Sequence, residues 1–540
     1  MRTHARLALA YLLTVLLLAP SATAQVTGES PADRPKIDPP KAAALVVEPD
    51  MKKHLRVLAA DDMEGRDTGT PGQAKAAEYI RKHLKEAGLK SLVADGSYFQ
   101  PWNLRSGPAN VSGSTIAWKR KGKAGTLRAG GEKRDERQFE ALPMTGQGKI
   151  TATAIFAGFG ITAKEYDYDD YAGIDAKGKI VVVLRHEPRE DEDSGWNGRT
   201  NTEYASFESK YKNAVDHGAA AIVFITDPVN HEEKKRRPEP SGAPGRGRAV
   251  EPNNKEAKDI PAVWADYTAL APALGGDAFL VDQQKKIDRT LKPASLALDD
   301  LTMTITLKVE GQDLATKNIC SFFEGSDPNL KKEFVVLGAH YDHVGVQPGG
   351  GSGDKIFNGA DDNASGTTTL LVVAQALAKS GMRPRRSIAF LHFSGEEKGL
   401  LGSEYYVAHP LRPLEDVVAM INMDMVGRAP ETGLEIVGTQ FSPDLRAVVD
   451  AETKAMGMKV EYKSGLDFER VLERSDQAPF YKKKIPIAFF TTGLHKDYHK
   501  VTDHWDLIIY PNMESVGRAI LRTALVVADA PYRPKFEEAK

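Results

Sequence analysis

From residue 301 onward, short apolar runs alternate with longer segments in which apolar residues recur every three or four positions. The short runs have the length and near-continuous apolar composition of strands that are buried on both faces, whereas the longer segments have helical periodicity. The expected strands are 333–337, 387–393, 417–422, 434–437 and 487–491, and the expected helices are 364–379, 402–408, 442–456, 476–483 and 513–528. This alternation predicts an α/β fold with a mainly parallel central sheet flanked by helices on both faces.

The middle of the chain has a different pattern. Residues 130–296 hold short β-rich runs at 149–157 and 179–184, a helical segment at 207–217 and an apolar strand at 219–226. We interpret this region as a smaller, inserted α/β-rich domain. Within it, residues 231–258 are dense in charged residues, proline and glycine, which predicts a flexible, solvated loop.

The first 24 residues have the pattern of an export signal. Arg2 and Arg6 precede an apolar run at 7–20, and the small residues at 21–24 form a cleavage site, so we expect a signal peptide at 1–24. The apolar run is shorter than the ~20 residues that a spanning helix needs, and we expect no transmembrane segment after cleavage. The mature protein is therefore expected to be periplasmic or secreted.

Two segments follow the signal. Residues 25–47 carry four prolines and no periodicity, which predicts a disordered or wrapping lead-in. Residues 53–58 and 72–88 have helical apolar spacing, and the Gly-rich string EGRDTGTPG joins them. These two helices belong to the region 48–129.

Composition narrows the function classes. A length of 540 residues predicts two or three domains, and the net charge of -2 gives no reason to expect nucleic acid as a partner. The single cysteine, Cys320, lies in the apolar string NICSFF and is expected to be a small buried hydrophobe. An intrachain disulfide is impossible, and neither a thiol nucleophile nor a cysteine-ligated metal fits.

Polar residues gather where the expected strands end. His340 and Asp342 follow the first strand, and the remaining candidates are Asp362, Glu396, Glu397, Asp424 and His499. Carboxyl ends of parallel strands meet at one edge of a sheet, so these side chains are predicted to converge. Each residue alone has an ordinary explanation, as a surface pair or a helix cap. Together they favour a metal centre, because clustered carboxylates without a cation repel one another strongly.

Imidazole and carboxylate are ligand types that suit zinc, although cobalt or manganese would also be accepted. Two histidines and three carboxylates can serve two metals only if one carboxylate bridges them. That arrangement predicts a hydrolase rather than a binding module.

Five strings carry a family resemblance, in the order GAHYDHVG, NGADDNASG, SGEEKGLLGS, NMDMVGR and DYHKVTD. With them, residues 317–506 resemble the co-catalytic di-zinc exopeptidase family, which includes secreted bacterial aminopeptidases and glutamate carboxypeptidase. Residues 58–88 resemble the N-terminal helical portion of the same catalytic domain. The strings GKIVVVLRHEP and NAVDHGAAAIVFI resemble the protease-associated domain that larger members carry. The resemblance implies a peptidase domain formed by 48–129 and 297–540, with the inserted domain between them.

The resemblance also implies a role for each site residue. One zinc would be bound by His340, Asp362 and Asp424, and the other by Asp362, Glu397 and His499. Asp362 and a water or hydroxide would bridge the two ions, and Asp362–Asn363 would be a cis peptide. Glu396 would be the general base, and Asp342 would orient His340 through its free ring nitrogen.

The mechanism expected from these roles is peptide hydrolysis. Two zinc ions ~3.5–4 Å apart lower the pKa of a shared water toward ~7, and Glu396 passes its proton to the leaving amine. Tyr498 is either an extra oxyanion donor or a packing aromatic. Gln477 stands where many relatives have histidine and can act neither as an acid nor as a ligand. His343, His495 and His504 are expected to line or support the site.

Two activities remain open. An aminopeptidase acting on peptides with a free N-terminus is favoured by NMDMVGR, with Glu473 or Asp476 available to bind the α-amine. A carboxypeptidase of the same fold would need arginines at the pocket, for which Arg428, Arg470 and Arg474 are available. A non-catalytic, receptor-like relative would be expected to lose ligands, and all five are present here. The sequence does not indicate the preferred terminal residue, the oligomeric state or the role of the inserted domain.

Overall fold

The computed structural model describes the chain from residue 37 to residue 538, apart from several internal stretches. Those stretches are 106–112, 130–137, 143, 194–195, 197–200, 232–247, 251–258, 309–312, 348–352, 429–432 and 463–470. The signal peptide, most of the lead-in and most of the expected loop at 231–258 therefore lie outside the described residues.

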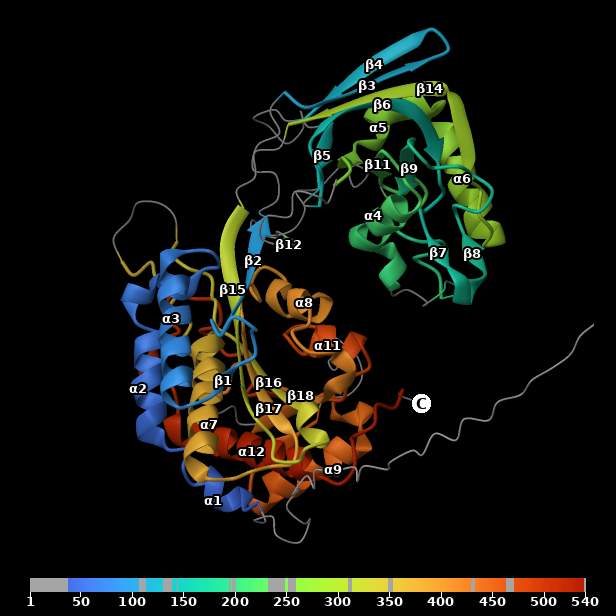
Figure 1. Ribbon diagram of the computed structural model, residues 1–540. Helices are drawn as coiled ribbons and strands as arrows, with labels where there is room; N and C mark the ends of the chain where they lie inside the picture. The colour runs from blue at the N-terminus through green and yellow to red at the C-terminus, as the bar shows by residue number, and fades with distance from the viewer. Residues whose placement is uncertain are drawn as a thin grey trace, which may run out of the picture. The chain divides into compact units, whose positions relative to one another are not determined.

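A mixed sheet of ten strands, which includes the strands expected after residue 301, forms the first core (Figure 1). Its four central strands are parallel, in the order β17 (Ser387–Phe393), β16 (Phe334–His340), β18 (Val417–Met423) and β21 (Ile487–Thr491). Every residue of these four strands is buried. The near-continuous apolar composition predicted strands of this kind, and their expected positions are confirmed to within three residues at either end.

Antiparallel strands extend this sheet at both edges. On the β17 side lie β15 (Asp313–Phe323), β2 (Phe99–Arg105) and β12 (Arg248–Val250), and β1 (Lys90–Ser91) pairs with β15. On the β21 side, β19 (Leu434–Val437) runs antiparallel and β20 (Val460–Glu461) continues parallel to β19. The strands β15 and β2 were not predicted from the sequence, because polar residues interrupt the apolar pattern of both strands.

Helices cover both faces of the sheet, as expected. One face packs against α1 (Pro39–Ala43), α2 (Glu48–Leu58), α3 (Pro71–Glu86), α7 (Gly366–Ser380), α9 (Pro443–Ala455) and α12 (Tyr510–Asp529). The other face packs against α8 (Leu401–Ala408) and α11 (Ala478–Lys482). Alternation along β16 explains the two layers, because Val335 and Leu337 enter the first cluster while Phe334 and Val336 enter the second.

The described part of the lead-in wraps onto this core. Residues 37–47 contain α1, and Ala42 and Val46 are fully buried in the first cluster. Arg518 on α12 donates to the carbonyl of Val46 at 3.0 Å.

A second sheet has eight strands and its own core. Its order is β4 (Lys123–Arg128), β3 (Thr115–Arg120), β14 (Leu296–Leu307), β6 (Gly148–Phe156), β9 (Ile180–Leu184), β11 (Ala221–Ile225), β13 (Ala262–Ala265) and β5 (Phe139–Ala141). The strands β6, β9, β11 and β13 are parallel. The sheet includes β3 and β4, which precede residue 130, and the part of β14 that follows residue 296.

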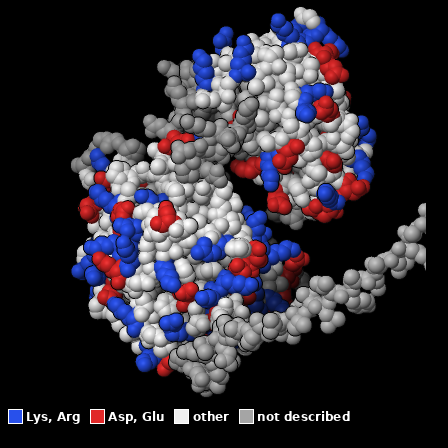
Figure 2. Space-filling view, in the orientation of Figure 1, with Lys and Arg blue, Asp and Glu red and all other residues white. Residues whose placement is uncertain are grey.

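Three helices accompany the second sheet: α4 (Phe207–Asp216), α5 (Tyr267–Leu274) and α6 (Asp277–Thr290). A two-stranded sheet of β7 (Thr162–Ala163) and β8 (Tyr168–Asp169) lies beside them. Among the described residues, no helix is both long enough and apolar enough to cross a bilayer. Figure 2 shows acidic and basic side chains interspersed over the visible face, in keeping with the small net charge.

Candidate metal centre

The structure brings the predicted metal ligands together at the carboxyl edge of the central strands. His340 is the last residue of β16, Asp424 follows β18, and Glu396 and Glu397 follow β17. Asp362 lies in the turn that opens α7, and His499 lies in the loop after β21. The side-chain atoms that could bind metal fall into two adjacent groups, one of His340, Glu396 and Asp424, the other of His343, Asp362, Glu397 and His499.

Asp362 faces both groups. Its Oδ1 lies 3.4 Å from His340 Nε2, and its Oδ2 lies 3.0 Å from His499 Nε2. His340 Nε2 is also 3.2 Å from Asp424 Oδ1, and His499 Nε2 is 3.1 Å from Glu397 Oε2. One carboxylate therefore offers one oxygen to each group, which is the geometry that a bridging ligand needs.

The ring of His340 is oriented by backbone. Its Nδ1 lies 3.2 Å from the carbonyl oxygen of Asp342, and because a carbonyl only accepts, Nδ1 carries the proton. Nε2 then faces Asp362 and Asp424 and is the ring nitrogen that a metal would bind.

The carboxylate of Asp342 lies farther from the ring, with 3.8 Å between Oδ1 and His340 Nδ1. It accepts from the backbone N–H of Glu396 at 3.2 Å and from the Thr68 hydroxyl at 2.9 Å. Asp342 thus connects the loop after β16 with the loop after β17 and with the EGRDTGTPG string.

His343 joins the site more closely than the sequence predicted. It is fully buried, and its Nδ1 lies 2.7 Å from Glu397 Oε1 and 3.7 Å from Asp362 Oδ2. The string HYDH gave a signal for it, since it places a second histidine on the loop that follows β16. In the geometry of the described residues, His343 holds Glu397 in place.

The adjacent residues Glu396 and Glu397 have opposite electrostatic settings. Burial raises the pKa of Glu396 well above its usual range. Burial acts in the same direction on Glu397, but hydrogen bonds with His343 and His499 outweigh it and hold the pKa of that carboxyl well below its usual range. Glu397 is therefore anionic, as a ligand must be, while Glu396 is a carboxyl that can accept and hold a proton.

The histidines hold protons that a metal would displace. Burial lowers the pKa of His499, yet hydrogen bonds with Asp362 and Glu397 outweigh it and raise this pKa to about 10. Metal binding must release this proton, so metal affinity falls as the pH falls.

Buried groups far away in sequence position the turn that carries Asp362. Asp503 Oδ2 accepts from the backbone N–H groups of Asp361 and Asp362 at 2.9 Å and 3.1 Å. Asp361 Oδ1 accepts from Gly427 N at 2.7 Å. The Asp362–Asn363 peptide is cis, as the family resemblance implied.

Arg66 connects the N-terminal region to two ligand-bearing loops. This fully buried guanidinium donates to the carbonyl of Tyr341 at 3.0 Å, of Asn358 at 2.7 Å and of Gly359 at 3.0 Å, and also to Leu58. Tyr341 directly follows His340, and Gly359 lies shortly before Asp362. The EGRDTGTPG string therefore braces the centre, whereas its sequence indicated only a turn.

Tyr498 and Gln477 lie beside the centre. The ring of Tyr498 stacks on the ring of His499 with 3.9 Å between centroids, which is a packing contact. Gln477 is buried, donates to the carbonyl of Leu472 and accepts from Asn422.

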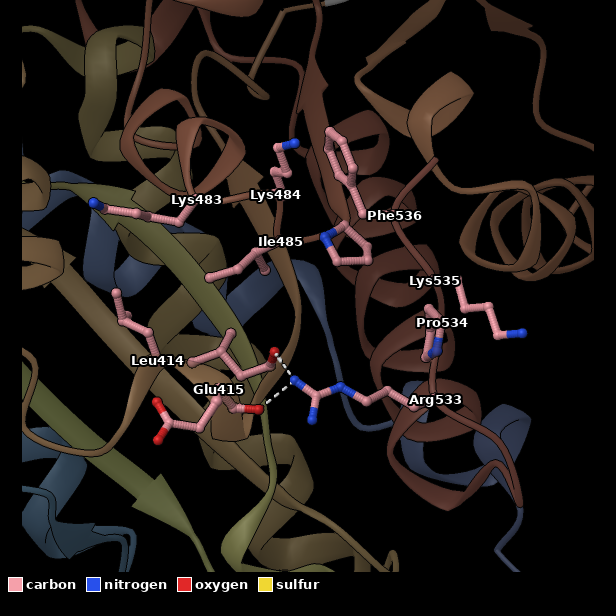
Figure 3. Close-up of a pocket in the computed structure, with 11 residues that line it drawn as sticks. Leu414, Glu415, Lys483, Lys484, Ile485, Arg533, Pro534, Lys535 and Phe536 are labelled. Carbon is pink, nitrogen blue, oxygen red and sulfur yellow. Dashed lines mark hydrogen bonds between the residues drawn. The ribbon is translucent and has the colours of Figure 1, made fainter. Parts of the chain in front are cut away.

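A pocket of about 700 Å³ lies at the opposite end of the same strands (Figure 3). Val417, which begins β18, and Pro486, which precedes β21, contribute to its wall. Arg533 crosses it and donates to the carbonyl oxygens of Glu415 and Val417. The metal centre lies at the carboxyl ends of these strands and the pocket lies at their amino ends, so the two sites are separate.

Comparison with known proteins gives family matches for two regions of the chain. Residues 318–524 match the model of peptidase family M28, and residues 147–272 match the PA domain. An aminopeptidase of Pseudomonas aeruginosa is 24% identical over 462 residues, which cover 81% of this chain and 69% of the relative. Aminopeptidase YwaD of Bacillus subtilis is 27% identical over 410 residues, which cover 73% and 70%. A solved zinc aminopeptidase from Bacillus subtilis aligns over 91% of this chain and 96% of its own, with 20% identity and a TM-score of 0.43.

Replacing His343 tests whether it supports the second metal group. We expect His343→Gln to lower zinc affinity by about 10–100-fold, because the substitution removes the imidazole that holds Glu397. Zinc titration monitored by competition with a chromophoric chelator measures the effect. His504→Gln is the matched control, since His504 pairs with Asp354 at the surface. Equal zinc affinity in the two variants would remove this role from His343.

Replacing Arg66 tests whether its hydrogen bonds to the ligand-bearing loops stabilise the fold. Arg66→Lys keeps the charge but cannot reach the same set of carbonyls, and we expect a loss of about 2–4 kcal/mol in the free energy of unfolding. Arg446→Lys, at a half-exposed pair with Asp450, should cost less than about 0.5 kcal/mol. Denaturant unfolding of both variants measures the difference. Similar losses of unfolding free energy would show that Arg66 does not stabilise the loops in this way.

Proposed function

Because the chain carries a catalytic domain of peptidase family M28 with an inserted PA domain, we propose that it is an exported aminopeptidase that uses two zinc ions. The observation that carries this proposal is the position of Asp362, whose two oxygens face His340 and His499 separately. Zinc suits the imidazole and carboxylate donors of both groups. Residues 1–24 support export through the pattern of a signal peptide.

In this proposal, His340, Asp362 and Asp424 hold one ion, while Asp362, Glu397 and His499 hold the other. When bound, the ions supply Lewis acidity to the scissile carbonyl and lower the pKa of water. Glu396 takes the proton from the attacking water and delivers it to the leaving amine. Burial raises the pKa of the Glu396 carboxyl, and the positive charge of bound ions would oppose that rise, so that the carboxylate could accept the proton and then release it.

The neighbours of Glu396 keep it in position. Asp342 accepts from its backbone N–H, and Asp342 is in turn held by Thr68. His343 and His499 keep the adjacent Glu397 anionic, so the two neighbouring carboxyls do not exchange roles. We include Tyr498 as a candidate oxyanion donor, with its ring held against His499.

The surroundings favour a substrate amine over a substrate carboxylate. Arg428 pairs with Asp497 and Asp503, and Arg474 is exposed. Arg470, the third candidate for a carboxypeptidase, lies outside the described residues.

Two carboxylates were candidates for binding the α-amine. Glu473 is half exposed and pairs with Lys482 at 3.5 Å. Asp476 is fully buried; burial raises its pKa to about 7, and His340 opposes that rise electrostatically. We therefore assign the amine-binding role to Asp476 in this proposal.

The base assignment is tested with Glu396→Gln. We expect hydrolysis to fall by about 10²–10⁴-fold with the zinc content unchanged, because the amide cannot accept the proton. Glu397→Gln is the matched comparison and should lose zinc, since it removes a ligand. Steady-state kinetics and elemental analysis of both purified variants provide the measurements. A Glu396→Gln enzyme with normal turnover would end the assignment.

Two substrates test whether the enzyme removes residues from the N-terminal or the C-terminal end of a peptide. We expect the mature enzyme to cleave an aminoacyl-anilide and to leave an N-blocked dipeptide intact, because the site is proposed to bind a free α-amine. A chelator should abolish cleavage and added zinc should restore it. Cleavage of the blocked dipeptide alone would favour the carboxypeptidase, and activity that persists after complete metal removal would contradict metal catalysis.

A further inference from the structure

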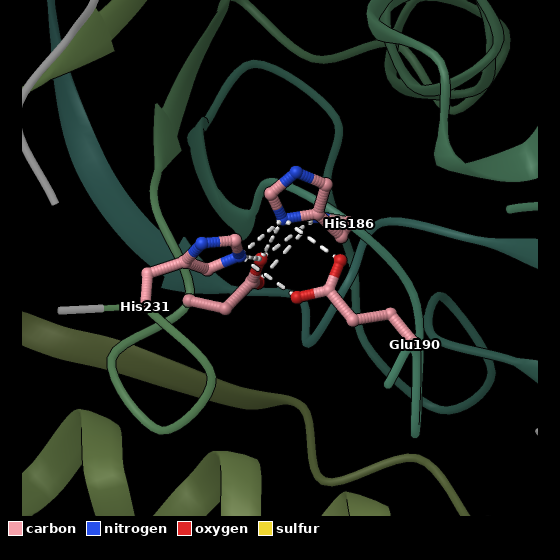
Figure 4. Close-up of side chains that lie close together, drawn as sticks. His186, Glu190 and His231 are labelled. Carbon is pink, nitrogen blue, oxygen red and sulfur yellow. Dashed lines mark hydrogen bonds and ion pairs between the residues drawn. The ribbon is translucent and has the colours of Figure 1, made fainter. Parts of the chain in front are cut away.

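A second group of metal-binding side chains lies in the PA domain, outside the peptidase site. Its members are His186, Glu190, Asp227 and His231, and one potential ligand atom from each lies within 4.8 Å of every other. Figure 4 shows the side chains of His186, Glu190 and His231 turned toward one another. Within the segment that matches the PA domain, these are two imidazoles and two carboxylates that converge on one point. This donor set is one that zinc accepts.

The sheet explains why these four residues meet. β9 and β11 are adjacent and parallel, and His186 and Asp227 each follow the carboxyl end of one of them. Glu190 lies four residues after His186, and His231 lies four residues after Asp227. Each loop therefore supplies one histidine and one carboxylate at the same spacing, in opposite order.

The potential ligand atoms are close enough to share one ion, and four of the five contacts between them are shorter than the edges of a tetrahedral zinc shell. His231 Nε2 is 2.8 Å from Glu190 Oε1 and 3.1 Å from His186 Nδ1. His186 Nδ1 is 3.2 Å from Glu190 Oε2 and in close contact with Asp227 Oδ2, while His231 Nε2 is 3.8 Å from that same Asp227 oxygen. Ligands bound to zinc at about 2.0–2.2 Å in a tetrahedron lie roughly 3.3–3.5 Å from one another.

Hydrogen bonds alone satisfy this group poorly. The Nδ1 of His186 offers either one proton or one lone pair, yet it faces Asp227, Glu190 and the other imidazole at once. The two carboxylates are nearly inaccessible, with exposed side-chain fractions of 7% for Glu190 and 1% for Asp227. Buried carboxylates within 4.8 Å of each other need positive charge between them, which either protons on the two imidazoles or a metal ion supplies.

The nearby lysine does not supply that positive charge at the centre of the group. Lys210 is fully buried, and its Nζ donates to the backbone carbonyls of Phe159, Leu184 and His186. The guanidinium of Arg185 lies over the ring of Phe207 and donates to the carbonyl of Ala205.

Both loops are held in place by α6. The backbone N–H of Arg189 donates to Asp288 at 3.1 Å, and the backbone N–H of Val229 donates to Gln284 at 2.8 Å. The backbone N–H of His186 also donates to Asp227. The contacts of Arg189 and Val229 with α6 do not involve the converging atoms, and they fix both loops independently, which is the preorganisation that a metal site requires.

We propose that His186, Glu190, Asp227 and His231 form a structural zinc site in the PA domain. Four protein ligands complete a tetrahedral shell, so the ion ties the loops after β9 and β11 together. The two imidazoles favour zinc over calcium and magnesium, which prefer oxygen ligands. This inference does not depend on the peptidase mechanism.

Zinc stoichiometry of the full mature chain tests the site. The near-isosteric variants Asp227→Asn and Glu190→Gln should each bind about one zinc equivalent less than the unsubstituted protein. His217→Gln is the control from the same domain, because its ring stacks on Tyr171 and its Nδ1 bonds to the Asn213 carbonyl. Zinc per chain is measured by elemental analysis after stripping with a chelator and reloading, and circular dichroism verifies the fold.

A double variant separates this site from the peptidase centre. His340→Gln with His499→Gln should retain about one zinc equivalent, and added zinc should raise its thermal midpoint by about 5–10 °C at a hundredfold excess over Kd. Introducing Asp227→Asn into this background should remove both the ion and the shift. If the peptidase centre held one ion instead of two, the total would change, but the difference due to Asp227→Asn would not. Equal zinc in Asp227→Asn, Glu190→Gln and His217→Gln proteins would overturn the proposal.

Discussion

Negative charge buried at the ends of parallel strands is the constraint on which this structure depends. Asp342, Asp361, Asp362 and Asp503 are all nearly inaccessible, and Glu397 joins them from the loop after β17. Such a concentration of carboxylates is unstable unless protons, hydrogen bonds or cations compensate it. Each kind of compensation has its own location here. Arg66 and backbone N–H groups compensate the charge at the periphery, and the histidines compensate it at the centre, where a bound metal would replace their protons.

This constraint explains why the chain uses segments so distant in sequence. Arg66 and its acceptor Tyr341 are 275 positions apart, and Asp503 lies 141 positions from the backbone N–H of Asp362. Each contact positions a loop rather than a ligand atom. The ligands can therefore come from loops, because buried hydrogen bonds such as those of Arg66 and Asp503 restrict the conformations of these loops.

Much of the fold and of the site could be predicted, for a physical reason. Strands such as 387–393 are continuous apolar runs, and residues that follow such runs in a parallel sheet share one edge. His340, Asp362, Glu397, Asp424 and His499 were identifiable because each belongs to a local string at such an end.

The residues that sequence reasoning missed act through partners that no local pattern reveals. Arg66 and Asp503 bond to backbone groups far away in the chain, and His343 was assigned a supporting position although it contacts Glu397 directly. The strands β2 and β15 were missed because polar positions such as Asn318 are buried by pairing with Gln100 across the sheet. His231 was assigned to a flexible loop because the segment that it begins is dense in charged residues, proline and glycine, and no local pattern reveals its partner His186, 45 positions earlier.

The peptidase centre and the PA-domain group are formed by the same kind of loops but differ in whether metal binding would leave a carboxyl unused. In both, loops after adjacent parallel strands supply imidazole and carboxylate together. At the peptidase centre, Glu396 lies 3.9 Å from His340 Nε2. Its carboxyl is not among the five residues that ligation would use. In the PA domain, the proposed tetrahedral shell would use all four converging residues, and no fifth acid or histidine belongs to the described group. A zinc site with an open position and a spare base is suited to catalysis, whereas a closed shell is suited to holding loops together. The same sheet geometry can therefore produce a reactive centre or a structural one, depending on whether a carboxyl remains after the metals are bound.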